Sequence, residues 1–386
     1  MKKIVISIIL SAAVLGGITS CASTKSTEET DLPTKDYKKG ELFSAGDVVV
    51  SNLVIDGIEI DKTGQVYATN ENGAVIKGKT PSTLPKSNRS IWYRGVFYSG
   101  HNVKLSPYII SKYEVTQELY KAVMQNQKVN VDGKEYTLND EPSEYKDTDW
   151  SPLAKGEVLK YRPVEHMSWY DAVYFCNVLS EKTGLNKAYN INIKKINEKN
   201  LITEAEVTWI ENSNGYRLPT ETEWEFAARG GDPTDEVWEY EFSGIDKAEG
   251  TKYFDEKNTA LDVVGWYCNN TMTGKTTQYE PPARVVGYGT HNVGLKAPNT
   301  LGLYDMSGNA SEWCYDFYNQ TPHLGDNKID GYYVNPKGPK TGTVRVLRGG
   351  TWGNSADRTS VGYRFDSPAY NPYAGTYTIR LVRSAK

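Results

Sequence analysis

Cysteine and histidine are the side chains of this sequence best suited to redox, nucleophilic or metal chemistry. The four histidines, at positions 101, 166, 291 and 323, include no pair at the spacing that places two ligands on one helix face. Cys176 is expected on the buried face of a helix, where a cysteine acts as a small apolar residue. Cys268 and Cys314 could form a disulfide in an oxidising compartment, and this stays open because sequence does not give the distance between them.

The fourth cysteine, Cys21, ends a leader sequence. Lys2 and Lys3 precede an apolar run of 15 residues over positions 4–18, shorter than the roughly 20 residues of a membrane-spanning helix but typical of a secretory signal. The run continues into Ile18-Thr19-Ser20-Cys21, which resembles a bacterial lipobox, where the cysteine is acylated, as with palmitate, and becomes the new N-terminus. The alternative is an ordinary signal peptide with an incidental cysteine.

The lipobox reading sets the expected location. Residues 1–20 would be removed as a lipoprotein signal peptide, and lipid on Cys21 would be the only attachment to a bilayer, because no second apolar run of spanning length follows. Ala22, rather than an aspartate, follows the cysteine, which favours the outer membrane over retention at the inner one. We therefore expect a surface-exposed protein of the cell envelope.

The third feature with chemical consequences is the composition of residues 353–378. This stretch holds four Tyr, three Ser, three Gly and two Asn, but no Lys, Glu, Leu, Ile or Met. Tyrosine gives a large contact area at small entropic cost, and Ser, Gly and Asn give adaptable hydrogen bonds, as in antibody binding sites. We expect a ligand-facing patch made of Trp352, Gly353, Ser355, Asp357, Phe365, Asp366, Ser367, Tyr370, Tyr373 and Tyr377. The alternative is a loop-rich domain end without a ligand.

Composition excludes several other classes of protein. The 386 residues carry 44 Lys and Arg against 48 Asp and Glu, and loss of Lys2 and Lys3 with the leader leaves 42 against 48, a net charge of −6. A weakly acidic chain has no electrostatic footprint for nucleic acid. A mean hydropathy of −0.58 excludes a multispanning membrane protein. Aromatic residues make up 12% of the chain, enough to build a core, so it is not disordered.

Three regions precede or form the folded part. Residues 21–45 are polar and charged, as expected for a flexible tether. In residues 46–85, short Val and Ile runs alternate with Asp56-Gly57, Thr63-Gly64 and Asn72-Gly73, which predict hairpin turns and a small β-meander. Residues 86–386 form the main domain.

The main domain must position the candidate ligand-facing residues. Its sequence predicts helices in the N-terminal part and irregular β-structure in the C-terminal part. Three capping patterns predict helix starts: Thr116, Ser168 with Asp171, and Thr220 with Glu223. After about residue 232 the helical periodicity is lost, and Gly, Asn, Pro and Tyr separate short apolar runs. This order predicts an α+β fold.

Four segments carry the most specific pattern. Residues 163–172, 215–225, 299–313 and 348–352 read PVEHMSWYDA, GYRLPTETEWE, NTLGLYDMSGNASEW and RGGTW. In this order, with the opening at residues 109–120, they resemble the formylglycine-generating enzyme family, also called the sulfatase-modifying-factor domain. The resemblance covers about residues 86–386. It implies a large, irregular and loop-rich variant of the C-type lectin fold.

The resemblance also bears on activity and cofactors. The family's enzymes oxidise a cysteine of a target sulfatase with two copper-binding cysteines, and the matching positions here hold Asn354 and Thr359. Neither is a thiolate, so we expect no enzyme activity and no required cofactor. A calcium site of the family matches Asp305, Gly308, Ala310 and Glu312, whose oxygens suit a hard cation. A metal-free turn is the equally weighted alternative.

The C-terminal region has a second resemblance. Residues 345–352 and 379–384 frame the Tyr-rich stretch in the way that the variable proteins of diversity-generating retroelements frame their mutated region. This implies a variable region over residues 345–384. The predicted function is a surface-anchored lipoprotein that binds an unknown protein or glycan on another cell. An active or degenerate formylglycine-type oxidase and a purely structural envelope lipoprotein are the alternatives.

Overall fold

The computed structural model describes residues 37–42, 44–45, 48–49, 52–81, 90–148, 151–252, 257–271, 286–372 and 376–385. The chain divides into two units, Met1–Asp31 and Leu32–Lys386, and only the second contains described residues. The predicted signal peptide, Cys21 and most of the tether lie outside them. None of the helices in this described part is long and apolar enough to cross a membrane.

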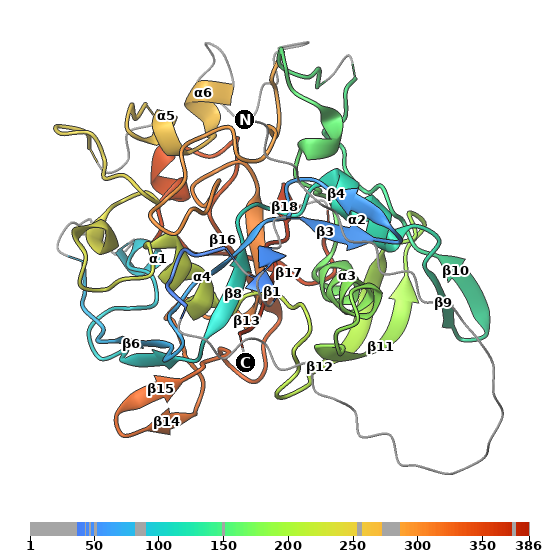
Figure 1. Ribbon diagram of the computed structural model, residues 1–386, viewed down its shortest axis with the longest axis horizontal. Helices are drawn as coiled ribbons and strands as arrows, with labels where there is room; N and C mark the ends of the chain where they lie inside the picture. Colours follow the sequence, from blue (N-terminus) through green and yellow to red (C-terminus); the bar gives the residue numbers. More distant parts are fainter. Residues whose placement is uncertain are drawn as a thin grey trace. The chain divides into compact units, whose positions relative to one another are not determined.

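The second unit is a loop-rich α+β structure, as the sequence predicts (Figure 1). Its first strands are β1 (Ser44–Ala45), β2 (Val48–Val49), β3 (Leu53–Ile55), β4 (Ile58–Ile60), β5 (Gln65–Tyr67) and β6 (Ala74–Ile76). The β3–β4 pair turns at Asp56 and Gly57, both with positive φ, as a two-residue hairpin requires.

Two of the three predicted hairpins do not form. Thr63-Gly64 and Asn72-Gly73 do not join paired strands, because β5 and β6 pair with strands of the main domain instead. β5 lies in a sheet with order β19-β8-β5, and β6 lies in one with order β14-β15-β7-β6. The added strands are β7 (Val103–Leu105), β8 (Tyr108–Ser111), β14 (Lys328–Ile329), β15 (Tyr332–Val334) and β19 (Val382–Ser384).

All three predicted helix starts are confirmed. Thr116 caps α2 (Gln117–Met124), Ser168 caps α3 (Trp169–Lys182) and Thr220 caps α4 (Glu221–Ala228), the last two with complete capping boxes. The other helical segments are one turn each: α1 (Ser90–Tyr93), α5 (Leu261–Val264), α6 (Cys268–Thr271), and 3₁₀ turns at Leu159–Tyr161, Glu236–Glu239 and Ala356–Thr359.

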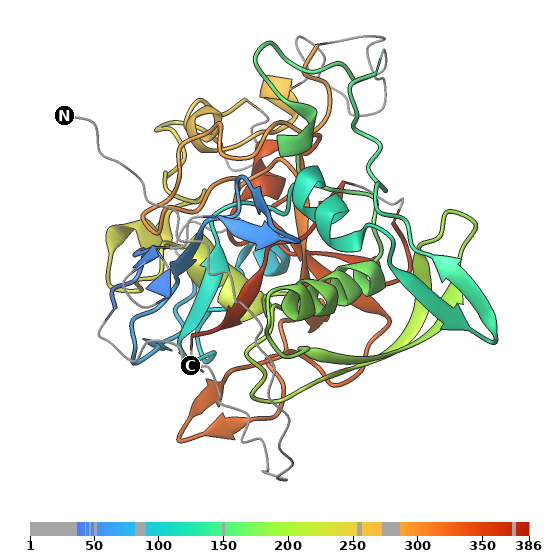
Figure 2. The same ribbon diagram turned by 45° about the vertical axis from the view of Figure 1, so that its right-hand side comes forward.

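Two hairpins were not expected from the sequence. β9 (Lys128–Val131) pairs with β10 (Lys134–Thr137), and β11 (Tyr189–Ile196) pairs with β12 (Ile202–Trp209). The longer hairpin runs beside α3, as the turned view shows (Figure 2). Its strands alternate partly buried and exposed residues, because only one face packs on the helix.

The C-terminal region builds the central sheet. β17 (Phe365–Pro368), β16 (Val344–Arg348), β13 (Ser311–Phe317) and β18 (Tyr377–Thr378) lie in that order, with the β13–β18 pair parallel. Successive side chains of a strand face opposite sides, so Leu347 packs in the cluster of Trp169 and Trp313, while Val346 packs in that of Trp224. The middle strand β16 is therefore buried on both faces, whereas the edge strand β17 exposes Phe365.

A C-terminal loop held by buried ion pairs

The structure divides the ten predicted ligand-facing residues into three groups. Phe365 and Tyr370 are exposed, at 43% and 58% of their full surface. Gly353, Ser355 and Asp366 are partly exposed. The other described members are buried, and these are Trp352, Asp357, Ser367 and Tyr377. Tyr373 lies outside the described residues.

The burial of four residues corrects the expectation that all ten face outward. Trp352 donates its indole N–H to the Thr376 hydroxyl at 3.1 Å and packs edge-on against Tyr145 and Tyr288. Tyr377 lies edge-on against Trp313, with ring centroids 5.1 Å apart. Rings fixed in this way are part of the core, and their types alone do not separate a core ring from a binding ring.

Asp357 and Ser367 are buried for different reasons. The Asp357 carboxylate accepts hydrogen bonds from the Tyr93 and Ser355 hydroxyls, both at 2.6 Å, and so fixes the 3₁₀ turn Ala356–Thr359. Ser367 lies opposite Arg345 in the β16–β17 pair, on the face that also carries Leu347. Both side chains are therefore buried and do not face outward as expected.

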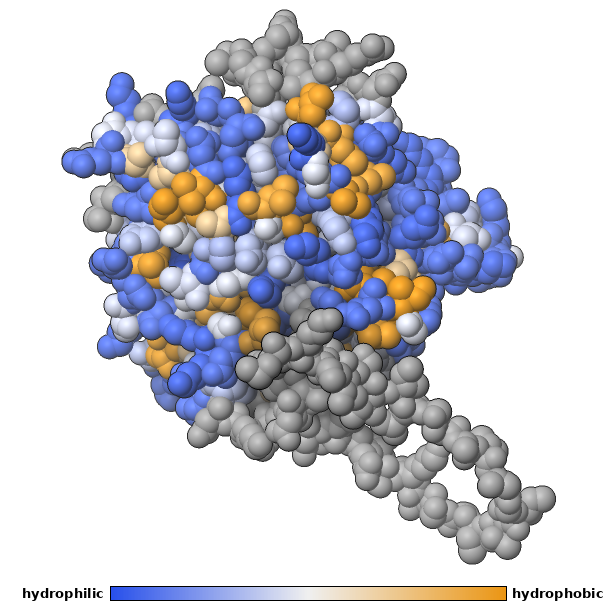
Figure 3. Space-filling view, turned by 45° about the horizontal axis from the view of Figure 1, so that its top comes forward, coloured by the Kyte–Doolittle hydropathy of each residue, from blue (hydrophilic) through white to orange (hydrophobic). Residues whose placement is uncertain are grey.

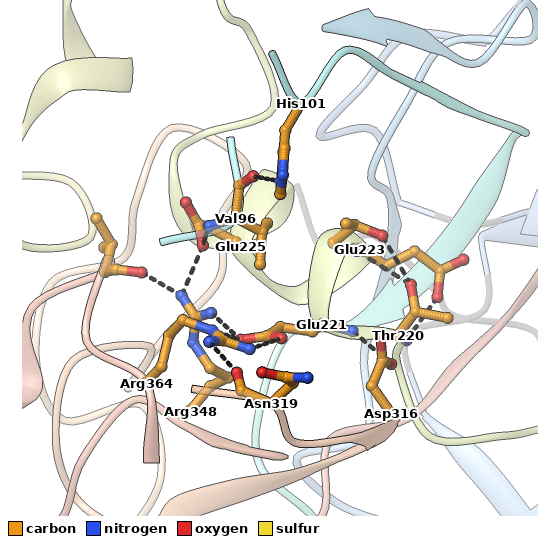
Figure 4. Close-up of polar contacts among 12 residues, drawn as sticks. Val96, His101, Thr220, Glu221, Glu223, Glu225, Asp316, Asn319, Arg348 and Arg364 are labelled. Carbon is orange, nitrogen blue, oxygen red and sulfur yellow. Dashed lines mark hydrogen bonds and ion pairs between the residues drawn. The ribbon is translucent and has the colours of Figure 1, made fainter. Parts of the chain in front are cut away.

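The loop between β16 and β17, residues 349–363, is called the display loop below. Arg348 and Arg364 flank it, and both guanidinium groups bind the carboxylate of Glu221, the first residue of α4 (Figure 4). The distances are 2.7 Å from Arg348 and 2.6 and 2.7 Å from Arg364. Arg348 also reaches Glu225 at 2.9 Å. One helix thus holds both ends of the loop, and we call these four residues the Glu221 clamp.

The electrostatics of the clamp follow from burial. Burial alone would raise the pKa of Glu221, but the positive charges of Arg364 and Arg348 hold it below its ordinary value, so the carboxylate is ionised. Asp316 accepts the Glu221 backbone N–H at 2.9 Å, and burial together with the Glu221 charge raises the pKa of Asp316 to about 8. Asp316 is therefore mostly protonated at neutral pH and adds little negative charge to the clamp.

A second buried ion pair holds the end of the C-terminal region. Arg380 donates to both Glu312 oxygens at 2.7–3.0 Å, and both side chains are fully buried. The Trp224 indole N–H donates to Glu312 at 2.7 Å. Arg380 also donates to the backbone carbonyls of Ser111 and Tyr304. The segment between β18 and β19 is therefore fixed independently of the display loop's own side chains.

Glu312 is one of the four residues matched to a calcium site. Both of its oxygens already accept hydrogen bonds from Arg380, and one also accepts from Trp224, so in this arrangement it does not fit a calcium ligand. Asp305 retains one buried oxygen without a hydrogen-bond partner. No group of three or more His, Cys, Asp or Glu side chains in the described residues is arranged to hold a metal ion. The calcium site and the metal-free turn both stay predictions, and these contacts favour the metal-free turn, because the Arg380 guanidinium supplies the positive charge here.

The positions matched to the family's catalytic cysteines lie in the display loop. The Asn354 side chain accepts the Thr351 N–H at 3.0 Å, and the buried Thr359 hydroxyl donates to the Ala356 carbonyl at 2.8 Å. Gly350 has a φ of +72°, and a Cβ there would come within 2.5 Å of the Arg358 carbonyl oxygen. The Gly-Gly turn therefore brings the backbone against the turn that carries Thr359.

The three described cysteines do not meet. Cys176, Cys314 and Cys268 lie in separate hydrophobic clusters, all buried, and the disulfide left open between Cys268 and Cys314 is not formed. Burial raises the pKa of the Cys176 and Cys314 thiols, which keeps them protonated and unreactive. The face of the molecule drawn in Figure 3 is mixed, with apolar patches separated by hydrophilic ones.

Sequence reasoning missed the partners of the clamp. It placed Arg348 in the RGGTW segment that frames the Tyr-rich stretch, but it did not connect Arg348 to Arg364 or Glu221. A signal was available: residues 353–378 contain Arg358 and Arg364 but no Lys or Glu, while α4 carries Glu221 and Glu225 four residues apart in a helix that reads as buried. Buried arginines need carboxylates, and the helix holds them.

The fold and the motif residues together define a class. A model of the sulfatase-modifying factor enzyme 1-like domain matches residues 63–385, so the chain belongs to this family of formylglycine-generating type. Treponema denticola variable protein 1 has a similar structure, with a TM-score of 0.57 and 29% identity over 86% of this chain and 98% of that one. A structure titled CarF, at 24% identity and a TM-score of 0.51, shows the same fold.

Two of the curated relatives by sequence carry names of different kinds. The chaperone protein LppX of Paenibacillus barcinonensis is 32% identical over 74% of this chain and 84% of its own length. The formylglycine-generating enzyme of Thermomonospora curvata is 28% identical over 65% of this chain and 72% of its own. Family membership therefore includes both enzymes and proteins named for other roles.

Proposed function

We propose that this chain is a lipid-anchored binding protein of the cell envelope that presents a diversified surface on a formylglycine-generating-type scaffold. The display loop and the adjoining β17–Tyr370 stretch would contact the ligand, a protein or glycan on a neighbouring cell. The observation that carries the proposal is the Glu221 clamp, which fixes Arg348 and Arg364 on either side of the loop. A loop fixed at both ends by scaffold residues can change sequence between them without loss of the fold.

The accessible side chains support this distinction between scaffold residues that fix the loop and loop residues that would contact the ligand. Between the two arginines, Gly353, Asn354, Ser355, Arg358 and Tyr363 are at least partly exposed, and Phe365 and Tyr370 follow. The buried residues that hold the loop in place include Trp352, Ala356, Asp357, Thr359 and Val361. Aromatic and small polar groups on a fixed backbone are suited to binding many different partners.

The absence of oxidase chemistry is part of the proposal. Two soft thiolates are needed to bind Cu(I), and the matched positions are the amide of Asn354 and the buried hydroxyl of Thr359. The described cysteines sit in three different clusters and could not replace them. Incubation of the purified chain with copper and a cysteine-containing sulfatase peptide should give no formylglycine by mass spectrometry. Conversion above a metal-free blank would favour the oxidase.

The DNA sequences of related strains test whether this surface is diversified. In closely related strains, substitutions should fall at adenines in the codons of Gly353, Ser355, Asp366 and Tyr370, while the codons of Arg348 and Arg364 stay constant. A reverse transcriptase gene and a near-copy of the 3′ end should lie close by. Substitutions spread evenly over the clamp and the loop, with no such copy, would contradict a diversified surface.

The relative named as a chaperone favours a second candidate. In that case the same face would bind one polypeptide of the same cell and would not vary between strains. The strain comparison separates the two, because a fixed partner requires a constant loop.

A further inference from the structure

A second concave surface lies away from the display loop. A groove of about 990 Å³ runs between the end of β12, the strand β13 and residues 324–340 around the β14–β15 hairpin, which are labelled in Figure 1. Trp209, Tyr315 and Phe317 contribute aromatic rings to its walls, and Pro336 and Pro339 line the opposite segment. The groove therefore offers apolar contact area with polar groups at defined points.

The charges along the groove do not balance. Its lining contains four cationic and three acidic side chains among the described residues. Three ion pairs account for all the acids: Arg217 with Glu223, Lys337 with Glu211, and Lys340 with Asp326. Arg345 is the cation that remains, and no ion pair to it occurs in the described part of the chain.

Arg345 is held rigidly and is only partly satisfied. It is 7% exposed, and its guanidinium lies over the rings of Trp169 and Phe317, at 3.7 and 3.5 Å from their centroids. One N–H donates to the Tyr315 carbonyl at 2.6 Å, while the buried Nε has no partner. Burial lowers the pKa of Arg345 to about 10, which still leaves it charged at neutral pH.

A nearby acid does not neutralise this arginine. Asp316 is a carboxyl group with an electrostatic influence on Arg345, but it accepts a hydrogen bond from α4, and burial raises its pKa to about 8, so it is mostly protonated at neutral pH. The tyrosines near Arg345, Tyr315 and Tyr170, are neutral because burial raises their pKa values. A buried guanidinium without a carboxylate is costly, and an anionic ligand would remove that cost.

We propose that this groove is a binding site for a carboxylate attached to an aromatic or apolar group, with Arg345 as the anion-recognition residue. One uncompensated positive charge matches a monoanion, whereas a phosphate dianion would leave excess negative charge beside Glu223 and Glu211. The planar guanidinium presents donors in the geometry that a carboxylate accepts. The ring of the ligand would pack on Trp209 and Tyr315. This site is separate from the proposed diversified surface.

The test uses N-acetylphenylalanine as the probe, with its neutral amide and phenyl phosphate as comparisons, titrated into the full-length chain by calorimetry and followed by indole NMR shifts. N-acetylphenylalanine should bind more tightly than either comparison. Arg345→Met, which keeps an apolar side chain between the two rings, should weaken that binding by about tenfold or more, as expected for loss of a charge-assisted hydrogen bond. Equal binding of the amide, or preferred binding of phenyl phosphate, would overturn the proposal.

A second variant keeps the test decisive if Arg345→Met fails to fold. Glu211 pairs with Lys337 but has a side chain that is 72% exposed, so Glu211→Gln should fold and should free Lys337 to attract the probe. The affinity of the Glu211→Gln variant for N-acetylphenylalanine should rise a few-fold. Glu141→Gln is the matched control, since Glu141 is an exposed partner of Lys121 outside the groove. No gain in Glu211→Gln relative to Glu141→Gln would also overturn the proposal, whereas Tyr370→Ser should leave probe binding unchanged.

Discussion

Replacement of Glu221 by glutamine tests the idea that the clamp holds the display loop. Glu221→Gln preserves shape but removes the charge that two buried arginines share. Arg348 would keep Glu225 and the Val361 carbonyl, at 2.9 and 2.5 Å. Arg364 would keep only the carbonyls of Asn319 and Gln320. The variant therefore leaves one buried guanidinium, 3% exposed, without any carboxylate.

The size of the effect follows from that single unpaired charge. Removal of one partner from a buried ion pair destabilises a protein by about 3–5 kcal/mol, because the remaining charge stays buried and uncompensated. For a domain of this size, about 2 °C of melting temperature corresponds to each kcal/mol, so the loss should be roughly 6–10 °C. The loop should loosen first, since Arg364 is its end point.

Urea unfolding followed by circular dichroism measures the free energy without the salt that guanidinium would add. Glu135→Gln is the control, because Glu135 pairs with Lys128 at 2.9 Å on the surface and should change stability by less than about 1 kcal/mol. Adding Arg364→Gln to Glu221→Gln should recover part of the loss, since the double variant buries no unpaired charge there. If Glu221→Gln unfolds within 1 kcal/mol of the parent, or the double variant is additive, the clamp does not hold the loop as argued.

Three further predictions concern other parts of the chain. Burial is the largest cause that raises the pKa of Asp316 to about 8 and the pKa of Glu241 to about 7. An acid with a raised folded-state pKa contributes stability that is complete below its ordinary pKa and is lost as pH rises to the folded value. The free energy of unfolding should therefore fall from about pH 5 to about pH 8, by at most about 1.4 kcal/mol per pH unit for each group, and should level off above that. The fall should be less steep in Asp316→Asn. A flat profile from urea melts at several pH values would contradict this. Cys21→Ser should abolish labelling by a fatty-acid analogue and release the protein from the membrane fraction, and a labelled, membrane-bound variant would rule out the lipobox. Calcium or a chelator should leave the melting temperature unchanged, because Arg380 occupies both Glu312 oxygens, and a calcium-dependent rise in melting temperature would show that Arg380 gives way to the ion.

The helices and the family were predictable because their signals are local. A capping box such as Ser168 with Asp171 is complete within four residues, and the structure reproduces it with a hydrogen bond at 3.0 Å in each direction. The turn signals of the N-terminal strands were less informative. Asn72-Gly73 turns the chain as expected, but whether the next strand returns to β5 or joins β7 depends on partners distant in sequence.

The ligand-facing residues were predicted from composition, which does not distinguish the two faces of a strand or loop. Tyr370 and Tyr377 are the same residue type seven positions apart, yet Tyr370 is 58% exposed and Tyr377 is 2% exposed. The difference comes from Trp313, which lies under Tyr377 in the neighbouring strand. Such contacts between separate strands are set by the tertiary structure, so a sequence of this kind predicts the segment and not the individual contacts.

Under the proposed function, the buried ion pairs would let a binding surface sit on this fold at little cost to stability. Ordering a flexible loop on binding costs free energy, and that cost is avoided when the loop is fixed beforehand. Here Glu221 fixes Arg348 and Arg364, and Glu312 fixes Arg380, while the residues between them contribute little to either ion pair. Buried ion pairs are poor sources of net stability but they demand specific partners. Their use at the ends of the loop therefore places the geometric constraint in the scaffold and leaves Gly353, Ser355 and Tyr370 available for change.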